Sequence, residues 1–162
     1  MKWVVLILAI ITAIFLLVSF AQDIKERTVY SFPCLILTDA WAIVLWGVAS
    51  FTKAEIICFL LVHYSIYLLL RLFKIWGDGD SDIFLLFGNI CMAFAKPGSI
   101  LSFAISECLL MALAVALSLL IGAVEYKVKK RKFSLNGDMA VIPGFAVVMI
   151  AVMATGFVER FM

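Results

Sequence analysis

The chain of 162 residues is 66% hydrophobic and 15% charged, and its mean hydropathy is +1.19. Soluble domains are typically about 45–50% apolar and about 25% charged, so this composition excludes a soluble enzyme, a disordered chain and a secreted disulfide scaffold. The net charge of +2 is too small to indicate a polyanion, and we expect no nucleic-acid partner. The composition therefore predicts an integral membrane protein whose principal surroundings are the lipid bilayer.

Six apolar stretches follow one another along the chain, separated by breaks that carry charged residues, glycine and proline. A bilayer core about 30 Å thick requires about 20 mainly apolar residues per helix. The stretches do not alternate with the period of two that is typical of membrane β-strands. They cover residues 3–20, 33–51, 54–73, 83–95, 100–124 and 139–158. We predict an all-α, polytopic bundle of six transmembrane helices that forms a single domain over residues 1–162.

The basic residues predict how this bundle is oriented, because short cytoplasmic loops carry an excess of Lys and Arg. With six spans and the N-terminus outside, nine of the 13 Lys and Arg residues lie inside, five of them in the run 127–132. A cleaved or inverted first stretch reverses this ratio, although Ser19-Phe20-Ala21 resembles a signal-peptidase site. Both termini are therefore predicted to lie outside, and the basic run is interpreted as a topological anchor.

The four cysteines lie in apolar stretches and form no Cys-x-x-Cys pair. They are interpreted as small buried hydrophobic residues rather than as disulfide or zinc ligands. They are Cys34, Cys58, Cys91 and Cys108. Three other polar residues interrupt apolar stretches. His63, the single histidine, is expected to hydrogen-bond across helices, and Asp39 and Glu107 to face the bundle interior or extend to the membrane surface.

Aspartates gather at two places on the predicted cytoplasmic side. Asp23 follows the first stretch, and three more precede the fourth, in Gly77-Asp78-Gly79-Asp80-Ser81-Asp82. Two membrane crossings separate these places, so both lie at the same face although Asp80 follows Asp23 by 57 positions. The fourth stretch spans only about 20 Å of helix, which favours a wet, protein-lined pocket for the segment 77–82 at membrane depth. Carboxylates at that depth are costly and typical of functional sites.

Two carboxylates brought together in a low dielectric cannot both ionise easily, so they share a proton. An aspartyl hydrolase needs such a pair, because one carboxylate activates water while the other protonates the carbonyl. Asp23 and Asp80 are the candidate catalytic pair.

Three motifs carry a resemblance to a known family. Gly77-Asp78-Gly79-Asp80 matches the GxGD signature of intramembrane-type aspartyl proteases. The stretch from Asp23 through Arg27 to Pro33 resembles the D-x-x-x-R-x-I-P-N stretch of prepilin peptidases, the type IV leader peptidases that include preflagellin peptidases. Ile142-Pro143-Gly144-Phe145 is similar to the proline-containing start of that family's last helix. The resemblance extends over essentially the whole chain.

The resemblance implies a catalytic dyad of Asp23 and Asp80, with Gly77 and Gly79 shaping the loop that carries Asp80. It implies no metal and no organic cofactor. The implied substrates are prepilin-like or pseudopilin-like membrane precursors of type IV pili or protein secretion. Their short basic leader would be removed at the cytoplasmic face of the prokaryotic inner membrane.

The chain also departs from the family pattern. Asp82 stands where the family commonly has a lysine, and Asp78 makes the loop unusually acidic, which either raises the apparent pKa of the dyad or helps to receive a basic leader. Residues 21–32 leave no room for the cysteine-paired cytoplasmic insertion of larger, N-methylating members, so we expect a minimal peptidase. The possible accessory residues are Arg27, Asp78, Asp82 and Pro143.

Two other functions use the same acids. A membrane prenyl or phospholipid transferase would hold Mg²⁺ with Asp23 and the acidic cluster. A small transporter or assembly subunit would line a polar path with them, although the two halves of the sequence show no internal symmetry. The cluster also spells the start of a calcium-binding loop, but Ile83 and Asn89 stand where glycine and glutamate are required.

Overall fold

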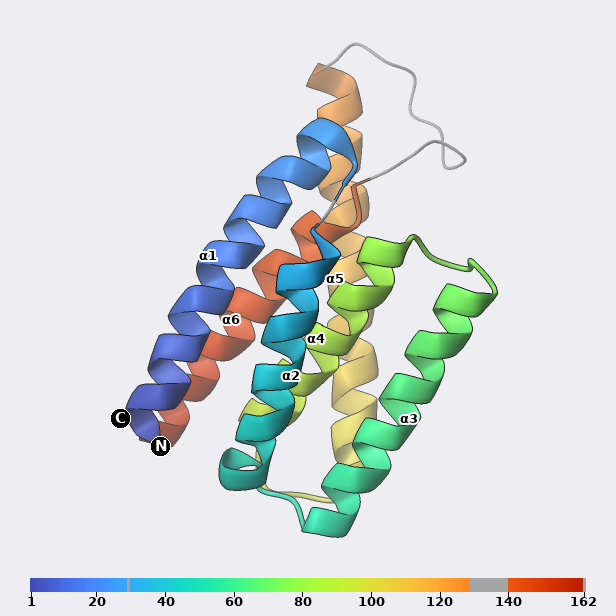
Figure 1. The fold of residues 1–162 in the computed structure, drawn as a ribbon. Coiled ribbons are helices and arrows are strands. Elements are labelled where there is room, and N and C mark those ends of the chain that lie inside the picture. Colours follow the sequence, from blue (N-terminus) through green and yellow to red (C-terminus); the bar gives the residue numbers. More distant parts are fainter. Residues whose placement is uncertain (29, 129–139, 162) are drawn as a thin grey trace.

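The computed structural model describes residues 1–28, 30–128 and 140–161, which form six helices and no strand (Figure 1). In chain order they are α1 (Lys2–Glu26), α2 (Ser31–Val48), α3 (Lys53–Leu72), α4 (Asp78–Phe94), α5 (Ile100–Val128) and α6 (Ile142–Phe161). The all-α prediction is confirmed. Five helices, all except α4, are long and apolar enough to cross a membrane, as in an integral membrane protein. A sixth span in α4 stays a prediction.

Helix α4 occupies the centre of the bundle, and every residue from 81 to 93 is buried. It packs mainly against α2, α6 and α3, while α1 packs on α6 and α2, and α5 packs on α6 (Figure 1). Protein therefore surrounds α4 on most sides. A helix in that position needs less apolar length than one facing lipid, because its neighbours supply the apolar surroundings.

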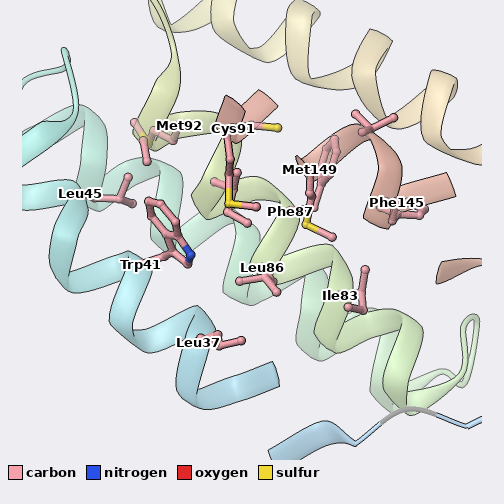
Figure 2. Close-up of a cluster of buried hydrophobic side chains, with 14 of the residues drawn as sticks. Leu37, Trp41, Leu45, Ile83, Leu86, Phe87, Cys91, Met92, Phe145 and Met149 are labelled. Atoms are coloured by element: carbon pink, nitrogen blue, oxygen red, sulfur yellow. The ribbon is translucent and has the colours of Figure 1, made fainter. Parts of the chain in front are cut away.

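The core lies where α2, α4 and α6 meet (Figure 2). Trp41 of α2 is fully buried and packs edge-on against Phe94, while Phe87 of α4 packs edge-on against Phe145 of α6. Polar contacts also join the helices, because the Trp41 indole donates a hydrogen bond of 3.0 Å to the Thr12 hydroxyl of α1. Such interhelical bonds satisfy groups that lipid cannot.

The two ends of the bundle differ in what they carry. At one end, called the termini end, the Lys2 ammonium donates a hydrogen bond of 2.8 Å to the Phe161 carbonyl, and both chain ends lie there (Figure 1). The opposite end, called the site end, carries the end of α1 and the beginnings of α4 and α6 (Figure 1). Which side of the membrane each end faces stays a prediction. Most of the predicted basic anchor, residues 129–132, lies outside the described residues.

Two sequence-based expectations are wrong. Asp78, Asp80 and Asp82 do not lie in a loop, because α4 begins at Asp78 after the N-cap residue Gly77. The apolar pattern marks where α4 becomes buried, not where it begins. The cysteines are not uniformly buried either, because Cys58 and Cys108 are exposed on the helix surface, while Cys34 and Cys91 are buried.

Candidate active site

Asp23 lies in the last turn of α1 and is only 5% exposed. Its Oδ2 accepts a hydrogen bond of 3.0 Å from the backbone N–H of Ile142, the first residue of α6. The first N–H groups of a helix have no partner within the helix and carry partial positive charge. The carboxylate of Asp23 therefore caps α6, and this contact fixes the orientation of the side chain.

The start of α6 is built to receive that carboxylate. Pro143 follows Ile142 and has no N–H of its own to satisfy. Gly144 donates its N–H to the Ser118 hydroxyl of α5 at 3.0 Å, and a Cβ at this position would collide with the Ala114 carbonyl oxygen. The predicted accessory residue Pro143 therefore lies in the turn that binds Asp23, and the glycine beside it permits close contact between α5 and α6.

Asp80 lies in the first turn of α4 and is half-buried. Burial and, second, the negative charge of Asp23 raise the pKa of the Asp80 carboxyl from 3.8 to about 6. A Cβ on Gly77 would approach Asp80 Oδ2 to 3.2 Å, so the glycine leaves space for this side chain. Gly79 lies half-buried in the same turn.

The structure brings Asp23 and Asp80 into one electrostatic environment at the site end. Their helices are not principal packing partners, since α1 packs on α6 and α2, whereas α4 packs on α2, α6 and α3. The two carboxylates therefore approach each other at the end of the bundle, beside the first residue of α6, instead of along an α1–α4 interface.

Arg27 ends α1 in a left-handed backbone conformation with φ of 56°. Its guanidinium donates two hydrogen bonds, of 2.9 and 2.8 Å, to the carboxylate of Glu125 near the end of α5. Both bonds start from one guanidinium nitrogen, Nη2, and both are charge-assisted, which makes them stronger than bonds between neutral groups. Arg27 therefore fixes the segment that carries Asp23 to α5. Glu125 is a partner that the sequence interpretation missed, and its signal is an acid ending a long apolar helix.

The other two acids of the cluster turn towards α3. Asp82 is fully buried and accepts a hydrogen bond of 3.1 Å from the Tyr67 hydroxyl, with the Arg71 guanidinium 3.5 Å away. Asp78 is exposed and lies 3.6 Å from Arg71. Residues two apart on a helix point in nearly opposite directions, so Asp80 and Asp82 serve different neighbours. Asp82 thus anchors α4 to α3 through Arg71.

Two further polar groups lie away from this site. His63 Nε2 and Glu107 Oε1 are 2.8 Å apart in the buried interior, which confirms the predicted hydrogen bond across helices. The His63 ring also contacts the Phe59 carbonyl through Nδ1, at 3.1 Å. Asp39 is exposed on α2 and accepts a hydrogen bond of 3.1 Å from the Tyr64 hydroxyl of α3, so it does not join the candidate pair.

The site combines an oriented carboxylate with a second carboxyl whose proton affinity is raised towards neutrality. Such a pair can supply one base and one acid within the same small volume. Within the described ranges, no group of three or more His, Cys, Asp or Glu side chains could hold a metal ion. No protein-family model, no curated protein and no solved structure matches this chain.

Proposed function

We propose that the protein is a membrane aspartyl endopeptidase of the prepilin-peptidase type. Its substrates are prepilin-like or pseudopilin-like membrane precursors, and it removes their short basic leader at the cytoplasmic face of the inner membrane. The proposal rests chiefly on one observation. The carboxyl of Asp80 has its pKa raised to about 6 by burial and by the charge of Asp23, a second carboxylate from a distant helix.

The two acids take different roles in this proposal. Asp23 is also buried, but the Ile142 N–H opposes the effect of burial and fixes the orientation of the carboxylate, so Asp23 acts as the base. Asp80, whose pKa is raised to about 6, acts as the acid. Asp23 removes a proton from water as the water oxygen attacks the scissile carbonyl carbon, and Asp80 donates its proton to the carbonyl oxygen. The C–N bond then breaks as the proton on Asp23 passes to the leaving amine, and a hydroxyl proton of the tetrahedral intermediate returns to Asp80.

The acid residues around the pair fit a basic leader. Asp78 is exposed at the beginning of α4, and Glu26 is exposed at the end of α1. Both side chains lie within one turn of a candidate catalytic residue and carry charge opposite to that of the leader. Each also has a basic neighbour, Arg71 at 3.6 Å from Asp78 and Lys25 at 3.9 Å from Glu26. Attraction between these acids and a basic leader favours capture of the substrate. Neither side chain takes part in the bond cleavage.

The test is leader cleavage in membranes, with a short-leader prepilin-like precursor and a metal chelator present throughout. Asp23→Asn and Asp80→Asn each remove one partner of the acid–base pair, and each is expected to slow cleavage by about 100-fold or more. Asp78→Asn is the matched control, because it removes the same charge two residues from Asp80 without removing a member of the pair, and it is expected to keep kcat for cleavage even if KM for the basic leader rises.

Two results would contradict the proposal. If both dyad variants are inserted normally and cleave the precursor at the rate of the unsubstituted protein, the acids do not perform peptide hydrolysis. If the chelator abolishes cleavage by the unsubstituted protein, a metal takes part, and the magnesium-dependent alternative is favoured instead.

A further inference from the structure

An apolar groove of about 580 Å³ runs along the outer surface between α3 and α5. Ile66 and Leu70 of α3 form one wall, and Ala112, Ala116 and Leu119 of α5 form the other. Phe84 of α4 and Trp76, just before α4, also line it. No side chain that is charged at neutral pH lines it, so its occupant is apolar.

The groove exists because α3 and α5 touch near the termini end and separate towards the site end. Their contact is made by Phe59 against Phe103, with ring centres 5.6 Å apart, and by the His63–Glu107 pair at 2.8 Å. The groove lining begins at Ile66, three residues after His63, and at Cys108, the residue after Glu107. The buried His63–Glu107 pair therefore closes the groove at its termini end.

At its other extremity the groove leads to the candidate active site. Trp76 lines it and precedes Gly77, the N-cap of the helix whose first turn carries Asp80. The exposed carboxylate of Asp78 lies in that same turn. That carboxylate is paired with the Arg71 guanidinium of α3 at 3.6 Å. An apolar segment in the groove would thus end close to the turn that carries Asp80.

The walls of the groove suit a helix. Ala112 and Ala116 lie four residues apart on α5, both exposed, and small residues at this spacing allow two membrane helices to approach closely. The lining on α5 extends from residue 108 to residue 119, about 17 Å of helix, or roughly half of a bilayer core.

We propose that this groove binds the apolar transmembrane helix of the precursor, with the scissile bond beyond it at Asp23 and Asp80. The inference rests on the proposed function and names where that function's substrate lies. The chain offers two exposed native cysteines to test it, since Cys108 lines the groove and Cys58 lies outside it.

The experiment is disulfide crosslinking in membranes between the full-length protein and a precursor with a single cysteine in its apolar helix. Asp80→Asn keeps the precursor uncleaved, and copper–phenanthroline with dissolved oxygen oxidises the two thiols to a disulfide. We expect a crosslinked product that disappears in the Cys108→Ser variant and persists in the Cys58→Ser variant. An equal yield of crosslinked product through Cys58, or no product through Cys108, would overturn the proposal that the groove binds the precursor.

Kinetics with the unsubstituted dyad give a second readout. Ala116→Phe fills the groove and is expected to raise KM for the precursor by about tenfold with little change in kcat, the pattern of lost uniform binding. Ala151→Phe makes the same change on an exposed position of α6 outside the groove and is expected to leave KM unchanged. Equal values of KM for the two variants would contradict the proposal.

The outcomes separate this inference from the proposed function. If cleavage depends on Asp23 and Asp80 but no Cys108 crosslink forms, the proposed peptidase function stands. The groove is then assigned to lipid chains, and this inference fails. A Cys108–Cys108 link between two copies, with no link to the precursor, assigns the groove to self-association and overturns the inference. Absence of cleavage by the unsubstituted protein overturns both proposals.

Discussion

Asp23 and Asp80 are the same chemical group in two different settings. The first lies against the peptide N–H of Ile142, and the second is half-buried with its pKa raised to about 6. Burial favours the neutral form of both carboxyls, and the backbone donor at Asp23 opposes that effect at one of them. In the proposed mechanism this difference assigns the base to Asp23 and the acid to Asp80.

The raised pKa of Asp80 predicts the pH dependence of cleavage. If Asp80 must be protonated to act, kcat/KM for leader cleavage falls as the pH rises through about 6. Asp78→Asn removes an exposed carboxyl of the same turn and is expected to leave this alkaline limb in place. A profile that stays flat from pH 5 to pH 8 (about three units) would contradict the role of Asp80 as the acid.

The raised pKa of Asp80 also predicts the direction in which the free energy of unfolding changes with pH. A carboxyl whose folded pKa is raised binds its proton more tightly in the folded state, so its contribution is fully present below the unfolded value and is lost as the pH rises through the folded value. For Asp80 the window lies between 3.8 and about 6. Asp80→Asn carries no titrating group and is the variant that removes this dependence.

At the scale of the elements, the site depends on contacts between helices that are far apart in sequence. The sequence predicts Asp23 and Asp80 at one membrane face, because two crossings separate them. It does not predict that α6 provides the N–H partner of Asp23 or that Glu125 of α5 binds Arg27. Local apolar patterns say where helices lie in the chain, whereas these partners follow from which helices pack together.

The contact between α5 and α6 leaves no space for a methyl group at Gly144. In Gly144→Ala the added Cβ meets the Ala114 carbonyl and the Ser118 side chain, so the two helices must separate. We expect a loss of about 1–3 kcal/mol in the free energy of unfolding. Unfolding of the purified protein in mixed detergent micelles measures this loss.

Gly98→Ala is the matched control for this substitution. A Cβ on Gly98 would meet only the Lys96 carbonyl oxygen, at an ordinary contact distance of 3.9 Å, and the residue does not have a positive φ. An equal loss of stability in the two variants would show that the packing of α5 on α6 is not the cause. Gly144→Ala is also expected to lower cleavage, because it displaces the turn that binds Asp23.

At the scale of the whole molecule, composition alone predicts a helical membrane protein, and the helices are where the hydropathy indicates, to within a few residues. The exceptions are α4, which begins five residues before its predicted start, and α1, which ends six residues beyond its predicted end. Hydropathy reflects the surroundings of each residue. The beginning of α4 is polar because Asp80 faces the site, while Asp78 and Asp82 face Arg71 of α3. The sequence of neither helix alone predicts that α3 and α5 separate towards the site end.

The orientation of the molecule is predicted by its basic residues and can be measured directly. Lys96 and Lys74 are both exposed, the first in the connection at the termini end and the second at the site end. With both termini outside, a membrane-impermeant maleimide is expected to label Lys96→Cys in intact cells and Lys74→Cys only after permeabilisation. The reverse labelling pattern would place the aspartates outside and contradict a cytoplasmic site.

The enclosure of α4 also bears on how the protein is made. Its residues 81–93 are buried against other helices, so a nascent chain that ends soon after α4 has not yet supplied all the neighbours that cover it. The N–H that orients Asp23 belongs to Ile142, and it emerges from the ribosome only after the first five helices. The two aspartates are therefore synthesised early and set in their working arrangement late. A truncated translation product carries both carboxylates without the contact that orients Asp23. Under the proposed function, only chains that have completed assembly in the bilayer cleave a precursor.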